Sequence, residues 1–169
     1  MESTTKLYSL NFSSANTYLF ALLFIVGNIA LPQLCHLVNL GGPTMLPIYF
    51  FTLIGAYKYG MKVGLLTAIL SPVINSLLFG MPAVAVLPAI LSKSVLLAIA
   101  AGYMASVSQK ITLLAMMRVV LAYQILGTLV EWAIVGDYYV AIQDFRIGIP
   151  GILLQIFGGY ALLKAIAKR

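Results

Sequence analysis

Long apolar runs separated by short polar connectors follow one another along the 169-residue chain. A helix needs about 20 mainly apolar residues to cross the hydrocarbon core of a bilayer, and most of the runs approach that length. The pattern predicts six membrane-spanning helices, over residues 17–36, 44–56, 63–79, 83–105, 111–135 and 147–165, of which the second is short. We therefore expect an all-α integral membrane bundle formed by a single domain, residues 1–169, in which residues 1–16 are a short cytoplasmic or interfacial lead-in.

Basic residues fall in alternate connectors between these runs. One set comprises Lys6 before the first run, Lys58 and Lys62 after the second, Lys110 after the fourth, and Lys164, Lys168 and Arg169 at the end of the sixth. The opposite connectors hold one basic residue, Arg146, together with Asp137 and Asp144. Because cytoplasmic loops of membrane proteins are enriched in Lys and Arg, this alternation predicts an even number of spans with both termini in the cytoplasm.

Composition narrows the class further. A mean hydropathy of +1.04 with 8% charged residues leaves no segment able to form a separate soluble domain. The net charge of +6 follows from the cytoplasmic rim and needs no partner beyond lipid headgroups, so we expect no nucleic-acid partner. The single cysteine, Cys35, excludes an internal disulfide, and its neighbour His36 has no evident companion ligand, so we expect neither a metal nor a cofactor.

Lys93 is the main exception to the sided pattern of charge. It lies about ten residues into the fourth run, which at 1.5 Å per residue is roughly 15 Å from the outer end, near the membrane midplane. A charge at that depth is costly and tends to persist with a partner or a function, so Lys93 should face the bundle interior. Two interpretations stay open: a structural ion pair with Glu131, or a site in which one or both residues hold a substrate.

Polar residues also gather in the outer half of the predicted spans. Gln124, Thr128 and Glu131 recur at helical spacing and form one inward-facing stripe. The connector over residues 136–148 adds two tyrosines, which serve either the site or anchoring at the membrane interface. The sequence predicts a polar cavity that opens outward, with candidate substrate-binding residues Lys93, Glu131, Trp132, Asn75, Gln155, His36, Asn39, Tyr138 and Tyr139.

Small residues predict where helices pack closely. Ala56, Gly60, Gly64 and Ala68 repeat every four residues, a spacing that allows close approach of helix backbones. This stripe serves either packing within the bundle or docking onto a partner membrane protein.

Three motifs follow one another through the second and third runs: Tyr57-Lys58-Tyr59-Gly60-Met61-Lys62-Val63-Gly64, Leu70-Ser71-Pro72-Val73 and Leu78-Phe79-Gly80-Met81-Pro82. They resemble the second and third helices of the S components, the substrate-binding membrane subunits, of energy-coupling factor (ECF) vitamin transporters. In that family an aromatic or glycine inner turn precedes a glycine-containing helix, a hydroxyl-proline step and a glycine-x-proline outer turn. The chain length and the six-span plan are similar as well.

The resemblance implies a six-helix bundle in the cytoplasmic (inner) membrane of a prokaryote. Such a bundle binds a vitamin or related small metabolite with high affinity at its outer face, and depends on a transmembrane coupling subunit and two ATPase subunits for uptake. Positions that fit the family's pocket are residues 39–44, Lys93, Glu131, Trp132, Tyr138, Tyr139 and Gln155. Family members often present alanines four apart on the first helix to the coupling subunit, whereas this chain has Ala21, Gly27 and Ala30.

The remaining sequence features favour a dependent binding subunit over other classes. The chain has no Gly-x-x-x-x-Gly-Lys-Ser/Thr loop for ATP and no evident pair of inverted repeats. One alternative is a stand-alone secondary transporter, ion-coupled through Glu131 or Lys93. The other is a small membrane enzyme, for which the sequence supplies no catalytic group of residues, so we expect no enzymatic activity.

Overall fold

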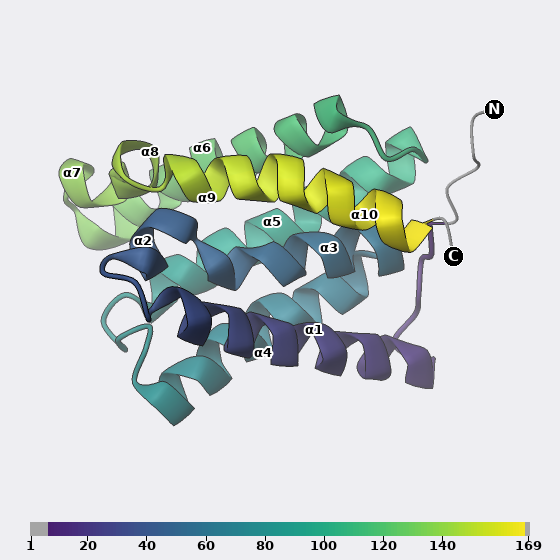
Figure 1. Cartoon of the computed structure of the whole chain (residues 1–169), viewed down its shortest axis with the longest axis horizontal. Coiled ribbons are helices and arrows are strands. Elements are labelled where there is room, and N and C mark those ends of the chain that lie inside the picture. The colour runs from purple at the N-terminus through teal and green to yellow at the C-terminus, as the bar shows by residue number, and fades with distance from the viewer. Residues whose placement is uncertain (1–6, 168–169) are drawn as a thin grey trace.

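The computed structural model describes residues 7–167, which form helices joined by short turns and loops and contain no strand. Five helices are long and apolar enough to cross a membrane: α1 (Ala15–Cys35), α4 (Met61–Phe79), α5 (Leu87–Ser108), α6 (Leu113–Val135) and a final 19-residue helix, Ile149–Ala167. These helices lie side by side along the long axis of the molecule (Figure 1). Five of the six predicted spans are thereby confirmed as long apolar helices, with ends that differ by a few residues.

The second predicted span differs from its prediction. The chain there forms three short pieces, α2 (Gly41–Met45), the 3-10 turn η1 (Pro47–Tyr49) and α3 (Phe50–Tyr59). Leu46, which precedes Pro47, separates α2 from η1 with a left-handed backbone, φ 47°. The right-handed helical region is disfavoured before a proline, so the helix breaks there. The stretch just before the second predicted span is therefore a short helix, and α3 has only ten residues.

Helix α3 nevertheless forms the centre of the bundle. It packs against α1, α4, α5 and α10 (Gly159–Ala167), and every residue from Thr52 to Lys58 is buried. Asn28 of α1 fixes its position, since its side-chain amide donates to the hydroxyls of Thr52 and Ser71 at 2.9 and 3.1 Å. The Oδ1 atom of Asn28 accepts from the N–H of Phe51, which lies in the first turn of α3, where N–H groups lack helical acceptors.

The stripe of small residues packs inside the bundle. A Cβ atom on Gly64 would lie 2.3 Å from Cβ of Ala56 and 3.2 Å from Cβ of Ala98, so α3, α4 and α5 approach too closely there for any side chain. Ala56 and Ala68 are fully buried. Internal packing, one of the two interpretations of the stripe, is thereby confirmed.

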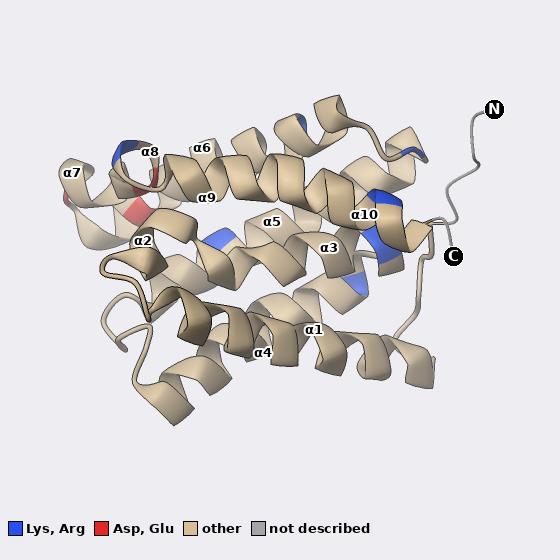
Figure 2. Cartoon of the chain, in the orientation of Figure 1, with Lys and Arg blue, Asp and Glu red and all other residues tan. Residues whose placement is uncertain are grey.

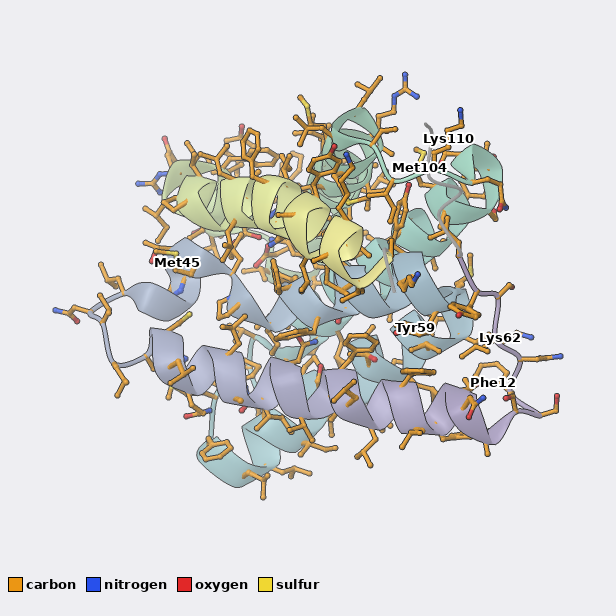
Figure 3. The ribbon with its side chains drawn as sticks, turned by 45° about the vertical axis from the view of Figure 1, so that its right-hand side comes forward. Phe12, Met45, Tyr59, Lys62, Met104 and Lys110 are labelled. Atoms are coloured by element: carbon orange, nitrogen blue, oxygen red, sulfur yellow. The ribbon has the colours of Figure 1, made fainter. Side chains whose placement is uncertain are left out.

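The two ends of the bundle differ in charge. Acidic residues lie only at the end near α7 (Tyr138–Ala141) and α8 (Gln143–Arg146) among the residues described, whereas basic residues are concentrated at the other end (Figure 2). We call the latter the lysine end and define it by Lys58, Lys62, Lys110 and Lys164; Figure 3 shows Lys62 and Lys110 there, opposite Met45. Lys6, Lys168 and Arg169, which the sequence places on the same side, lie outside the described residues.

The N-terminal segment closes the lysine end. Its backbone donates hydrogen bonds from Tyr8 N to Lys58 O at 2.9 Å and from Leu10 N to Tyr59 O at 3.1 Å. Gly60, with φ 105°, forms the one-residue turn between α3 and α4, and a Cβ atom there would meet the backbone of this segment at 3.2 Å. The lead-in expected from the sequence is thus bound to the α3–α4 turn over its described residues.

Candidate functional site

A cavity of about 430 Å³ lies at the end of the bundle opposite the lysines, which we call the cavity end. Helices α1, α4 and α6 end there, and α5 and the final helix begin there. Its wall is mainly apolar with a few polar groups, and its volume falls within the range of small-molecule sites. The lining residues are Pro32, His36, Gly42, Pro43, Leu46, Pro47, Ile48, Tyr49, Asn75, Met81, Pro82, Ala83, Val86, Ile90, Lys93, Glu131, Val140, Gln143 and Asp144.

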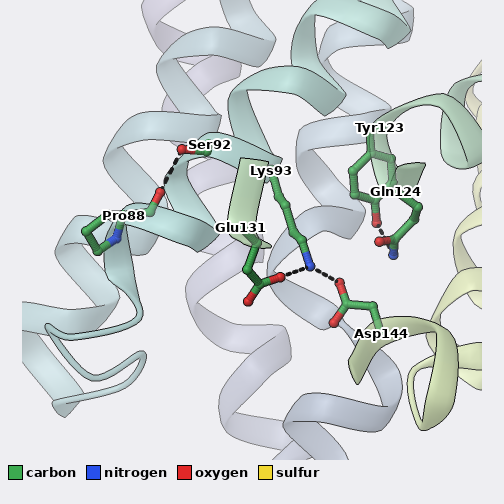
Figure 4. A network of polar contacts seen from close by, with 7 residues as sticks. All are labelled: Pro88, Ser92, Lys93, Tyr123, Gln124, Glu131 and Asp144. Atoms are coloured by element: carbon green, nitrogen blue, oxygen red, sulfur yellow. Dashed lines mark hydrogen bonds and ion pairs between the residues drawn. The ribbon is translucent and has the colours of Figure 1, made fainter. Parts of the chain in front are cut away.

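Three charged side chains meet on the cavity wall. The Nζ atom of Lys93 donates to Oδ2 of Asp144 at 2.7 Å and forms an ion pair with Oε2 of Glu131 (Figure 4). The side chain of Lys93 is 3% exposed, and those of Glu131 and Asp144 are 15% and 12% exposed. Because these charges are largely removed from water, their mutual pairing is strong and the loss of one partner is costly.

Lys93 and Glu131 meet because they lie at similar depths. Helix α5 begins at Leu87, so Lys93 lies about 9 Å from that end at 1.5 Å per residue, and Glu131 lies about 6 Å from the end of α6 at Val135. Because α5 begins four residues later than the predicted span, Lys93 lies nearer the start of its helix than the roughly 15 Å expected from the sequence. Gly127 of α6 makes room for the lysine, since a Cβ atom there would lie 2.6 Å from Cγ of Lys93.

Asp144 belongs to the connector that folds back over the cavity end. Asp137 caps α7 by accepting from the N–H groups of Tyr139 and Val140, and α8 follows with Asp144 buried to 8% exposure. The next helix starts close against α2, since a Cβ atom on Gly151 would lie 2.5 Å from the Met45 carbonyl. The sequence placed Asp144 among the outer acids but did not identify it as a site residue.

Two more predicted site residues line the cavity. Asn75 of α4 is 2% exposed, and its Oδ1 atom accepts from Nε2 of Gln33 at 3.0 Å, which orients the amide. His36 follows the last turn of α1, next to the half-buried Cys35. A Cβ atom on Gly42 would lie 2.5 Å from Cε1 of the His36 imidazole, so the glycine lets α2 pack against the ring.

Five predicted site residues do not line this cavity. Trp132, Tyr138 and Tyr139 are 47%, 53% and 72% exposed and form an aromatic cluster on the outside of the cavity end, with ring centroids 5.6 and 6.2 Å apart. Their amphipathic rings match the alternative role as anchors at a membrane interface. Asn39 is exposed beyond the end of α1.

Gln155, the fifth, is fully buried away from the cavity wall. Its Oε1 atom accepts from the Tyr123 hydroxyl at 2.7 Å, and that hydroxyl accepts from Nε2 of Gln124 at 3.1 Å. The residue lies in the π-helical segment η2 (Leu154–Gly158), between α9 (Ile149–Leu153) and α10. This cluster connects α6 to the final helix. It lies beneath the cavity, since the ring of Tyr123 contacts the Tyr49 ring on the cavity wall, with 5.6 Å between the centroids.

Besides Asp144, sequence reasoning missed Tyr49 and Gln143 on the cavity wall. Tyr49 is 3% exposed in η1, inside what reads as an apolar run, and no sequence signal distinguishes it from a membrane-facing tyrosine. Gln143 lies one residue before Asp144 in the connector, so the same fold-back brings both into the site.

The chemistry available at this site is recognition by charge and hydrogen bonding. Among residues 7–167, no group of three or more His, Cys, Asp or Glu side chains is placed to hold a metal ion. Lys93, Glu131 and Asp144 supply both signs of charge, and the apolar wall supplies contact area for a small organic molecule.

Fold and cavity together define the class of the molecule. Five long apolar helices are typical of a multi-pass membrane protein, and the cavity at one end of the bundle has the size and lining of a small-molecule site. No family model, curated protein or solved structure matches the chain.

Proposed function

We propose that the protein is the membrane-embedded substrate-binding subunit of an ECF-type importer for a vitamin or related small metabolite. The observation that carries the proposal is the buried Lys93–Glu131–Asp144 network on the wall of the cavity of about 430 Å³. Buried charges within a membrane bundle are costly, and they commonly mark a substrate or ion site. The resemblance of the residue 57–82 motifs to S components indicates which class of importer to test.

In this proposal the chain crosses the inner membrane of a prokaryote six times, with α3 as the additional crossing. Helix α3 has only ten residues, about 15 Å at 1.5 Å per residue, but its neighbours cover it, and a broken crossing is tolerated where protein buries the backbone. Helix α1 begins and α10 ends at the lysine end (Figure 1), which supports cytoplasmic termini under the positive-inside rule. The cavity then opens on the outer face.

Uptake would depend on a separate coupling subunit and two ATPase subunits. Ala21 is buried, and a Cβ atom on Gly27 would meet the Phe51 ring at 2.8 Å, so these two small residues of α1 pack within the bundle, whereas Ala30 is exposed. We therefore propose that a coupling subunit docks on other residues, and the lysine end is the cytoplasmic face from which it approaches.

The decisive experiment separates binding from transport. The full chain is purified in mild detergent, and small molecules released on denaturation are identified by mass spectrometry. Uptake of the labelled molecule is then measured in proteoliposomes that contain the chain alone, and in ones that also contain the coupling and ATPase subunits of its host with internal ATP. We expect retention by the chain alone and uptake only with the full set. A chain that retains no molecule contradicts the proposal.

A stand-alone carrier is the second candidate, and the observation that favours it is the pair of titratable carboxylates beside Lys93, which suits ion coupling. Uptake by the chain alone that stops when an ion gradient is collapsed would establish this alternative and exclude the dependent subunit.

A further inference from the structure

The charged groups on the cavity wall do not balance. Two carboxylates, Glu131 and Asp144, face one ammonium group, Lys93, and no other Lys or Arg among residues 7–167 lines the cavity. Arg146 lies two residues beyond Asp144, but it is exposed and does not line the cavity. By formal charge, the two carboxylates and the one ammonium group sum to minus one.

Each of the two carboxylates has a second oxygen atom that is available to accept a hydrogen bond from a ligand. Each carboxylate uses one oxygen for Nζ of Lys93, and the second oxygen of each points away from the lysine (Figure 4). Among the described residues no side chain or backbone N–H donates to these second oxygens. A ligand that carries N–H donors and a positive charge would satisfy both, while Lys93 remains paired.

The rest of the wall fits a flat apolar body. Leu46, Pro47, Ile48, Val86 and Ile90 contribute hydrocarbon, and the Tyr49 ring adds an aromatic surface. The amide of Asn75 offers one neutral polar contact at the same wall. A purely aliphatic polyol or a highly charged anion would leave this surface or the carboxylates without complementary groups.

We infer that the ligand is a small organic cation, in which an N–H-rich charged edge such as an amidinium or a protonated amino-heterocycle is attached to an apolar ring. This inference rests on the proposed function of the cavity as a substrate site. It goes beyond that function by assigning the sign of the ligand's charge and the residues, Glu131 and Asp144, that select it.

Three probes of one shape test the sign of the charge. Benzamidinium, benzamide and benzoate share a ring and have nearly equal size, but carry a positive, zero and negative charge at neutral pH. Their affinities for the purified full chain, freed of retained ligand by dialysis, are measured by thermal stabilisation at millimolar probe concentrations. We expect benzamidinium to bind on the order of tenfold more tightly than benzamide, and benzoate to bind most weakly.

Substitutions of Glu131 and Asp144 test whether these two carboxylates cause the preference for benzamidinium. Glu131→Gln and Asp144→Asn should each lower benzamidinium affinity by on the order of tenfold and reduce its advantage over benzamide. Asp137→Asn is the matched control, because Asp137 caps α7 away from the cavity wall, and it should leave the ratio unchanged. The wild-type ratio alone tests the inference if a variant fails to fold.

Equal binding of the three probes, preference for benzoate, or binding of none of them overturns the inference. So does a retained metabolite that proves to be neutral or anionic, and that result would leave the proposed binding function intact. Conversely, a chain that prefers benzamidinium but transports without other subunits would keep this inference and remove the dependent importer.

Discussion

Hollows of similar size occur at the two ends of the bundle, yet their walls differ. At the lysine end a space of about 340 Å³ is bordered by Tyr8, Leu10, Asn16, Phe20, Lys58, Tyr59 and Ile166. Lys58 there lies over the Tyr8 ring at 5.4 Å, and Phe20 stacks on Tyr59 at 3.9 Å. At the cavity end, opposite charges from three separate segments converge. Volume alone therefore does not separate the two hollows, whereas opposite charges held together at the cost of desolvation do.

Among substitutions at the two ends of the bundle, the loss of the Lys93 ammonium group should have the largest effect. In Lys93→Met two buried carboxylates lose their partner, so we expect ligand retention to vanish and the free energy of unfolding to fall by about 3–5 kcal/mol. Retention is measured by mass spectrometry and stability by denaturation in detergent. Lys93→Met combined with Glu131→Gln and Asp144→Asn should recover most of the stability without recovering binding. If binding returns as well, the network is only structural.

A polar cluster that is fully paired inside the bundle should behave in the opposite way. Asn28→Ala leaves the Phe51 N–H without its acceptor and the Thr52 and Ser71 hydroxyls without their donor, so unfolding should become easier by about 1–3 kcal/mol. Ligand affinity in the folded fraction should stay unchanged. An affinity loss larger than the stability loss would extend the site into the centre of the bundle.

A smaller effect at the cavity end should come from a methyl group placed against the Lys93 side chain. Gly127→Ala places a methyl group 2.6 Å from Cγ of Lys93, and the displaced ammonium should weaken ligand binding by about tenfold, or about 1.4 kcal/mol. The same substitution should destabilise the Lys93→Ala protein much less than the wild type. Equal destabilisation of the wild type and of the Lys93→Ala protein would show that the methyl group does not clash with the Lys93 side chain.

The smallest effects should come from two residues outside the cavity, one at each end of the bundle. Trp132→Ala and Lys62→Gln should leave ligand affinity unchanged, since neither side chain lines the cavity. Each should change stability by about 1 kcal/mol or less, through the loss of its own ring contact with Tyr138 or Phe12. Titration of the retained ligand measures both variants. A clear affinity loss in Trp132→Ala would return the aromatic cluster to the site, as the sequence suggested.

The sequence predicted the long helices well, because about 20 consecutive apolar residues leave few alternatives in a membrane. It failed over residues 41–59, where short pieces depend on local backbone chemistry such as the left-handed Leu46 before Pro47. The pairing of Lys93 with Glu131 was one of two open interpretations, since two charges in neighbouring apolar runs have few other partners. Asp144 was missed because its position depends on how a polar connector packs onto α2, which no periodic pattern records.

The aromatic residues show a different limit. Trp132, Tyr138 and Tyr139 carry the same amphipathic signal whether they contact a ligand or lie at a membrane interface. Only the direction of the side chain separates the two roles, and that direction depends on the last turn of α6 and on the short helix α7.

The chain's single thiol precedes a residue of the cavity wall in the sequence. Cys35 is half-buried in the last turn of α1, one residue before His36 on the cavity wall. A maleimide fluorophore or nitroxide spin label can therefore be attached at this position of the natural sequence without prior removal of other cysteines. Its emission or line shape would then report occupancy of the cavity in real time, in detergent, nanodiscs or whole membranes.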